Sequence, residues 1–205
     1  MSRIKRIEPE NFDPELQEMM DVERRTPLEI GNVRYYAHRP ELAKALLQFM
    51  GVLRAPGLLS ARLIELVRLR VAFHNQCRSC MAIRYDMAVQ DGVSEDLVCQ
   101  LERPQDAADL TAAERVALRY ADLFATNHLA IDDALIEELR EHFSEPEIVE
   151  LGLNVSIFVG LGRFSAVCDM IEELPERFQQ RDQPVVPWGP DAILVERLDR
   201  DAALA

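Results

Sequence analysis

The chain has 205 residues, 48% of them hydrophobic, which suits one domain with a core that needs no metal or disulfide for stability. Aspartate and glutamate number 36 against 23 lysines and arginines, a formal net charge of −13. A field of this sign repels phosphate backbones and anionic lipids, so we expect no nucleic-acid partner and no membrane-surface attachment.

The N-terminus and the longest apolar stretch bear on the compartment. Residues 1–6 are not followed by an apolar run, so we expect no signal peptide. The stretch from Leu151 to Gly162 is interrupted by Asn154 and Ser156 and is shorter than the roughly 20 residues that span a bilayer. We therefore expect a cytoplasmic protein, in which thiols are kept reduced.

Helical periodicity dominates the sequence, and no sustained alternation predicts a strand. The expected fold is therefore all-α. In the first half of the chain, we expect helices over 13–22, from Pro40 to Gly51 or to Pro56-Gly57, and from Ser60 to Asn75, where Asn75 would be a left-handed terminator. The next helices are expected from Cys77 to Val89, from Ser94 to about Leu101 and from Thr111 to about Ala125. The last two are expected over 131–143 and, after the cap at Ser144, from Ile148 to about Glu172.

Two of these helices begin with a capping box, in which the first and fourth residues satisfy each other's backbone N–H groups. The boxes are Thr111 with Glu114, and Ser144 with Glu147. The helix after Ser144 is apolar over most of its circumference, which predicts that it is the central buried helix.

The tail changes character after residue 182. Pro184, Pro187 and Pro190 punctuate the segment 183–191, with Trp188 between them. This pattern predicts an extended arm over 183–205 that packs on the helical domain, 1–182, or on a neighbouring subunit.

The cysteine pair Cys77-Arg78-Ser79-Cys80 carries the clearest chemical signal. Residues three apart on a helix share a face, so the two sulfurs can come within bonding distance. A helix N-terminus and the charge of Arg78 both favour a thiolate, which promotes nucleophilic attack and disulfide exchange. This spacing is typical of a redox pair.

Two other interpretations of the pair stay open. The cysteines could be inert buried residues, because free cysteine is among the most buried residue types. They could also supply half of a zinc site, although Cys99 and Cys168 are isolated and no second pair exists. We read Cys99 and Cys168 as ordinary core thiols.

Glu65 precedes Cys77 by twelve residues, about 18 Å along a continuous helix. Only a chain turn over residues 74–76 would return Glu65 to the cysteines, where a carboxylate could exchange a thiol proton. Spacing alone favours a surface glutamate paired with Arg62 or Arg68.

At this point several motifs, in order, resemble one known family. Glu65, eleven intervening residues and the Cys-x-x-Cys pair are similar to the alkylhydroperoxidase D-like proteins of the carboxymuconolactone decarboxylase superfamily. The other motifs are the Arg-rich helix before the pair, Ala88-Val89-x-x-Gly92, Leu110 to Arg115, Ala117 to Ala121, Phe143 to Leu151 and Gly162-Arg163-Phe164. The resemblance covers roughly Pro40 to Glu173.

The resemblance implies an all-α helical-hairpin core, usually assembled into a homo-oligomer such as a dimer, trimer or hexamer. It also implies a thiol peroxidase or disulfide reductase. In these roles Cys80 meets the peroxide, Cys77 resolves it to a disulfide, and Glu65 belongs to a proton relay.

The sequence departs from the family pattern at one position. The pattern Cys-x-x-Cys-x-x-x-His places its proton-carrying histidine where this chain has Arg84. Arginine stays protonated and cannot act as a base, but it can stabilise a thiolate or bind an anionic substrate. His74 could replace the imidazole or could be a surface residue at the helix end.

Three functions follow from these residues. The first is a peroxidase or disulfide oxidoreductase that uses Cys80 and Cys77 with an external dithiol. The second is a decarboxylase-like enzyme for a small carboxylated substrate, held by Arg84, with His74 or Glu65 moving protons. The third is a non-enzymatic redox-sensing oligomer.

No phosphate loop, haem or flavin signature is present, so we expect no organic cofactor and no metal.

Overall fold

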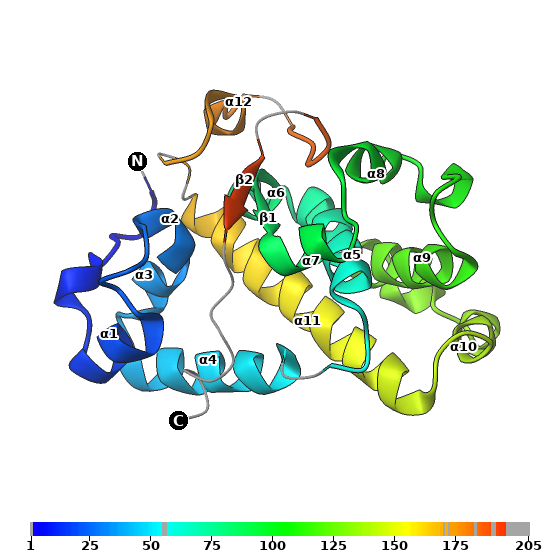
Figure 1. Ribbon diagram of the computed structural model, residues 1–205, viewed down its shortest axis with the longest axis horizontal. Coiled ribbons are helices and arrows are strands. Elements are labelled where there is room, and N and C mark those ends of the chain that lie inside the picture. The colour runs from blue at the N-terminus through cyan, green and yellow to red at the C-terminus, as the bar shows by residue number, and fades with distance from the viewer. Residues whose placement is uncertain are drawn as a thin grey trace.

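The computed structural model describes residues 2–54, 57–169, 171, 173–182, 184–189 and 192–195 (Figure 1). These residues form an all-α fold with a small two-stranded addition. The α-helices are α1 (Pro14–Met20), α2 (Pro27–Ile30), α3 (Val33–Tyr36), α4 (Pro40–Arg54), α5 (Ala61–Asn75), α6 (Arg78–Ala82), α7 (Asp86–Gln90), α8 (Glu95–Gln100), α9 (Ala112–Thr126), α10 (Asp133–Arg140), α11 (Glu145–Cys168) and α12 (Glu176–Gln179). Short 3-10 helices cover Pro9–Asn11, Pro104–Asp106 and His128–Ala130.

The helix starts predicted at Ser60, Ser94, Thr111 and Ser144 are confirmed because they depend on local hydrogen bonds, whereas the helix expected over 131–143 begins at Asp133. The hydroxyls of Ser60 and Ser94 each accept a bond from the backbone N–H three residues later, at 3.1 and 3.2 Å. Thr111 and Ser144 begin α9 and α11 with the expected capping boxes. The left-handed residue that ends α5 is Gln76, at φ 49°, and not Asn75.

Helix α5 lies at the centre of the main core. It packs against α9 on one side and α11 on the other. Leu66, Val67, Leu69 and Val71 are fully buried there. This placement makes α5 the rigid element from which the cysteine segment projects.

Helix α11 runs diagonally across the molecule between α1–α4 and α5 (Figure 1). By length and composition alone, its 24 residues could cross a membrane, a property that core helices share. The shorter apolar stretch 151–162 did not predict this. The helix is central, as expected, but one of its faces is not buried. Val149, Leu153, Phe164 and Val167 are exposed there.

The N-terminal helices form a second core, of which the sequence predicted only some of the helices. Only α1 and α4 were expected there, not α2 and α3. Phe12, Leu16 and Met20 pack with apolar residues of α2–α4. Buried Arg34 donates to Glu173 at 2.8 Å and to Glu8 at 2.6 Å, which ties this layer to the segment after α11.

Two short strands contradict the expectation of no strand. Strand β1 (Ile83–Tyr85) pairs in parallel with β2 (Ile193–Val195), with Arg84 opposite Leu194. Strand β1 divides the helix expected from Cys77 to Val89 into α6 and α7. Arg84 is therefore not on the helical face of Cys80.

The described part of the C-terminal arm packs on its own chain. Trp188 lies against the Phe73 ring at 4.9 Å between centroids. The amide of Gln76 donates to the Val185 carbonyl at 3.2 Å and accepts from the Val185 N–H at 3.1 Å. Of the predicted arm, Gln183, Pro190, Asp191 and residues 196–205 lie outside the described residues.

Candidate functional site

Cys77 and Cys80 form a disulfide within the α6 segment, with an S–S distance of 2.09 Å and Cα atoms 5.2 Å apart. The left-handed Gln76 turns the chain after α5, so that Cys77 becomes the N-cap of α6. Cys77 is fully buried, whereas Cys80 is half-buried and lines a cavity. Of the two sulfurs, Cys80 is therefore the one a small molecule in the cavity can reach.

Helix α6 has only five residues. A helix N-terminus favours a thiolate through the helix dipole, which sums over aligned peptide units. In so short a helix this stabilisation of the thiolate is small. Any stabilisation of a Cys80 thiolate must come mainly from neighbouring side chains.

The turn after α5 brings the segment that follows the cysteines back to Glu65, which accepts from the Tyr85 N–H at 3.4 Å, but the carboxylate faces Arg68 and does not line the cavity. The Arg68 Nε and one terminal nitrogen each donate to it at 2.7 Å. The same guanidinium donates to the Cys80 carbonyl at 2.6 Å and to the Ile83 carbonyl at 2.9 Å. The pairing at helical spacing was foreseen, but the glutamate is buried, not on the surface.

The Glu65–Arg68 pair is held in a dry environment. Burial alone would lower the pKa of Arg68, but the charge and hydrogen bonds of Glu65 outweigh it and raise that pKa above its usual value. Tyr85 covers the guanidinium, with its ring centroid 5.0 Å away. Arg68 is therefore a fixed positive charge beside Cys80.

His74 lies on a different side of α5. Its Nε2 is 2.7 Å from Asp122 on α9, which also accepts from Arg70 at 2.7 Å. His74 is not among the residues that line the Cys80 cavity. The structure therefore does not bring this imidazole to the cysteines.

Arg84 is buried among structural partners. It donates to both oxygens of Glu95, at 2.8 and 3.1 Å, and to the carbonyls of Met81 and Ile83. A further bond of 2.6 Å reaches the carbonyl of Pro187 in the arm. Arg84 does not line the cavity, because its guanidinium holds α8, the α6–β1 segment and the arm together.

The remaining cysteines differ from each other. Cys168 is buried, as expected, and burial raises the pKa of its thiol. Cys99 is exposed, which corrects the reading of it as a core thiol. Within the described ranges, no group of three or more His, Cys, Asp or Glu side chains is placed to hold a metal ion.

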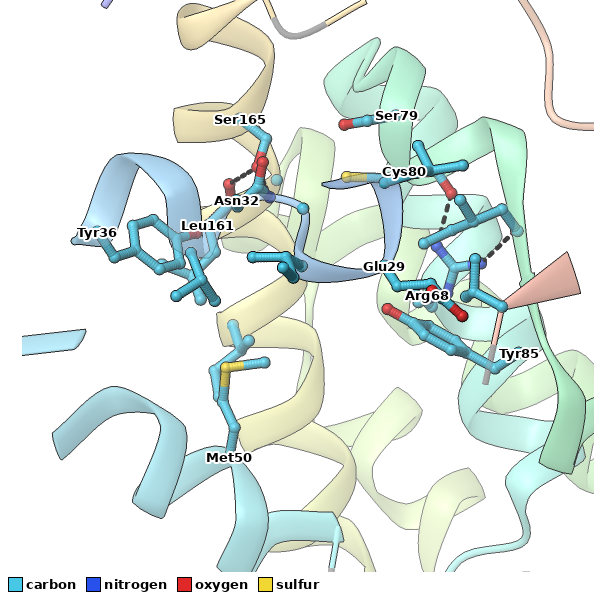
Figure 2. Close-up of a pocket in the computed structure, with 18 of the residues that line it drawn as sticks. Glu29, Asn32, Tyr36, Met50, Arg68, Ser79, Cys80, Tyr85, Leu161 and Ser165 are labelled. Atoms are coloured by element: carbon cyan, nitrogen blue, oxygen red, sulfur yellow. Dashed lines mark hydrogen bonds between the residues drawn. The ribbon is translucent and has the colours of Figure 1, made fainter. Parts of the chain in front are cut away.

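The cavity beside Cys80 has a volume of about 200 Å³ and is lined by α1–α6, β1, α11 and β2. Figure 2 shows two polar groups on its opposite sides. Cys80, Arg68 and Tyr85 lie on one side, and Asn32 with Ser165 on the other. The wall is otherwise mostly apolar, so the cavity suits an apolar molecule with polar ends.

Several of these lining residues carried no signal in the sequence. Asn32 belongs to the N-terminal layer, which reaches the cysteines only through the tertiary fold. Arg68 was expected only as a possible partner for Glu65. Ser165 lies on a helix that was expected to be apolar over most of its circumference.

Comparison with known proteins supports the resemblance. Residues 40–123 match the profile of the Carboxymuconolactone decarboxylase family. Two uncharacterized proteins of Mycobacterium tuberculosis, from strains CDC 1551 and H37Rv, are 41% identical over 93 residues, which is 44% of this chain and 32% of theirs. The match therefore spans about a third of the length of these curated relatives.

Two solved structures share the fold. A protein of unknown function from Agrobacterium tumefaciens, suggested to be the antioxidant defence protein AhpD, gives a TM-score of 0.58 at 26% identity, covering 69% of this chain and 97% of that one. An uncharacterized peroxidase-related protein from Ralstonia eutropha JMP134, with an alkylhydroperoxidase AhpD core, gives 0.71 at 18% identity, covering 92% and 97%. Residues 40–123 therefore match the carboxymuconolactone decarboxylase family, and the fold of the chain is of the alkylhydroperoxidase D-like type.

Proposed function

We propose that this protein is a thiol peroxidase that reduces a small organic hydroperoxide at Cys80. The observation that carries the proposal is the asymmetry of the disulfide: Cys80 lines the cavity, and its partner Cys77 is fully buried. A hydroperoxide in the cavity meets Cys80 first, and the sulfenic acid that results is within reach of Cys77. The family match over residues 40–123 and the similarity to the Agrobacterium tumefaciens structure support a peroxidase-like or decarboxylase-like chemistry.

The proposed cycle begins with reduced cysteines. The Cys80 thiolate attacks the terminal oxygen of the hydroperoxide, so that an S–O bond forms as the O–O bond breaks and the alkoxide leaves as an alcohol after taking a proton. The Cys77 thiol then displaces water from the sulfenic acid, which gives the disulfide. An external dithiol reduces this disulfide by exchange and is itself oxidised. A dithiol-dependent cycle fits the cytoplasm, where we propose that the protein acts.

Arg68 and Glu65 support this cycle from beside Cys80. The fixed charge of Arg68 favours the thiolate over the thiol, since a nearby cation stabilises an anion. We propose Glu65 as the acid–base partner that the family resemblance implies, acting from within its pair with Arg68. Arg84 and His74 have no part in this mechanism, because their hydrogen bonds are made elsewhere.

The decarboxylase alternative receives less support from the cavity. Arg84, the residue expected to hold a carboxylate, is bound to Glu95 and to backbone carbonyls. Arg68 lines the cavity, but its hydrogen-bond donors are occupied by Glu65 and by the carbonyls of Cys80 and Ile83, so it has no fork of N–H groups left for a carboxylate. Decarboxylation also needs no dithiol.

The test is consumption of an organic hydroperoxide with dithiothreitol as the reductant. Cys80→Ser should lower turnover by about 100-fold or more, because it removes the attacking atom. Cys77→Ser should still consume peroxide at Cys80 but should form no intramolecular disulfide, because dithiothreitol must then reduce the sulfenic acid itself. Cys99→Ser is the matched control and should retain turnover within about twofold, since this exposed thiol lies outside the cavity.

Three results would contradict the proposal. Full turnover by Cys80→Ser would show that another group reduces the peroxide. A disulfide that cycles with oxidant and reductant without catalytic consumption would indicate a redox sensor. Decarboxylation of a small carboxylated substrate that survives alkylation of both cysteines would favour the other branch of the superfamily.

A further inference from the structure

The cavity beside Cys80 has a second polar group that the proposed peroxidase cycle does not use. The Asn32 amide donates to the Ser165 hydroxyl, which in turn donates to the Leu161 carbonyl at 2.9 Å. Tyr36 lies next to both side chains (Figure 2). We call Asn32, Tyr36 and Ser165 the distal cluster, because Figure 2 places them across the cavity from Cys80 and Arg68.

The distal cluster has an unused hydrogen-bond acceptor. Among the residues that the structure describes, the Asn32 Oδ1 is buried without a hydrogen-bond partner. An unsatisfied buried acceptor costs about 1–3 kcal/mol. A ligand that brings a donor to this atom would recover that free energy.

Tyr36 determines the charge of the cluster. Burial raises the pKa of Tyr36 to about 12, although its contacts with Ser165 and Asn32 favour the ionised form. The phenol is therefore neutral at any physiological pH, and all three side chains of the cluster are uncharged. An ionised carboxylate has no donor for the Asn32 Oδ1, so the cluster favours a neutral group with an O–H.

The size and wall of the cavity limit the rest of the ligand. At about 200 Å³ it is somewhat larger than the ~150 Å³ protein cavity known to bind benzene. The wall also includes the apolar side chains of Met50, Leu161 and Ile83. An apolar body of roughly six to eight carbon atoms fits this space.

We propose that the distal cluster binds a hydroxyl group of the substrate, so that the preferred substrate is a hydroxylated organic hydroperoxide. The hydroxyl donates to the Asn32 Oδ1 and accepts from the neighbouring Tyr36 phenol, the apolar body crosses the cavity, and the hydroperoxide group reaches Cys80. This inference rests on the proposed peroxidase function for its reacting end. Its binding end is independent of turnover and can be tested separately.

The kinetic test compares 6-hydroxyhexyl hydroperoxide with hexyl hydroperoxide. The wild-type protein should prefer the hydroxylated compound by about tenfold in kcat/KM, mostly through KM, because one buried hydrogen bond is gained. Tyr36→Phe and Asn32→Leu should each reduce this ratio to about twofold or less. Tyr120→Phe removes a hydroxyl from a tyrosine of α9 that does not line the cavity, and should keep the ratio.

The binding test uses the oxidised protein, which cannot react with peroxide. Calorimetry should show that hexan-1-ol binds about tenfold more tightly than 1-methoxypentane, which has the same size but no O–H to donate, and that Tyr36→Phe reduces the difference. Ser156→Ala is a further control, since Ser156 also donates to the carbonyl four residues earlier on α11 but lies outside the cavity. If Asn32→Leu does not fold, Tyr36→Phe carries the test.

The two proposals fail in different ways. Turnover of both hydroperoxides with equal kcat/KM, and equal binding of hexan-1-ol and 1-methoxypentane, would overturn the hydroxyl site and leave the peroxidase intact. A preference for hexan-1-ol that depends on Tyr36, in a protein that consumes no hydroperoxide, would support the hydroxyl site and overturn the peroxidase.

Discussion

The guanidinium of Arg68 joins three parts of the candidate site. It pairs with Glu65 one turn earlier on α5, and it binds the carbonyls of Cys80 and Ile83 across the chain turn. The two charged side chains are buried, because Arg68 and Glu65 are 6% and 2% exposed. Removing one member of such a buried pair leaves the other as an uncompensated charge.

Arg68→Met should therefore lower the free energy of unfolding by about 3–5 kcal/mol. The double variant Glu65→Gln with Arg68→Met should recover at least half of this loss, because no charge is then buried alone. Urea unfolding followed by circular dichroism measures both values. A loss below about 1 kcal/mol for Arg68→Met would show that Glu65 is not held as an ionised partner.

At this scale the sequence predicted part of the site. The cysteine spacing and the pairing of Glu65 with Arg68 are local relations on one helix, and both hold in the structure. The place of Arg84 could not be predicted, because it depends on β1 replacing a helix and on the arm carbonyl of Pro187, 103 residues later. The same is true of Asn32, which reaches the cavity through the fold.

Helix starts were predictable because capping side chains lie within four residues of the groups they satisfy. Thr111 is the clearest case: its N–H donates to Glu114 at 2.8 Å, and Arg62 donates to the same carboxylate at 2.5 Å. The end of α6 was not predictable in this way. Residues 83–85 become a strand because β2, from the far end of the chain, pairs with them.

The Glu114 cap predicts a dependence of stability on pH. Burial alone would raise the pKa of Glu114, but hydrogen bonds from Arg62 and Thr111 outweigh it and hold that pKa below its usual range. A carboxyl with a lowered folded-state pKa stabilises the fold above its unfolded pKa, about 4.3, and this contribution is lost as the pH falls through the folded value.

Glu114→Gln should therefore cost about 1–2 kcal/mol in the free energy of unfolding at pH 7 and progressively less below about pH 4. Urea unfolding at a series of pH values measures this difference. Glu102→Gln, at an exposed glutamate, should have no comparable effect. A cost for Glu114→Gln that is the same at pH 7 and at pH 3 would contradict the assignment.

At the scale of the whole molecule, α11 is central to the fold yet open on one side. Val149, Leu153, Phe164 and Val167 form an apolar stripe along that side. The family resemblance implies a homo-oligomer, and we expect its subunits to meet at this stripe. Two copies that each carry a net charge of −13 repel one another, so a mostly apolar face suits their contact.

The double variant Leu153→Asp with Val167→Asp should reduce the mass in solution to that of a single chain, because two buried carboxylates would oppose association. Light scattering coupled to size exclusion measures this mass. Leu129→Asp is the matched control, since Leu129 is 85% exposed and lies outside the stripe. A wild-type protein that is already a single chain would contradict the expected oligomer.

The all-helical class and the family were predictable at this scale because they rest on periodicity and on motifs in order. The exposed stripe was not, since composition alone does not distinguish an apolar helix enclosed by its own chain from one left open on a side. The path of the arm was equally hidden, because Gln76 and Arg84 hold it from distant positions.

The central claim is that peroxide oxygen is transferred to Cys80, and the most direct measurement locates that oxygen. The Cys77→Ser variant, treated with one equivalent of hydroperoxide, should retain a sulfenic acid that dimedone traps. Peptide mass spectrometry should find the adduct on Cys80 in most chains and not on Cys99 or Cys168. Consumption of the peroxide without an adduct on Cys80, or with the adduct on Cys99, would contradict the account.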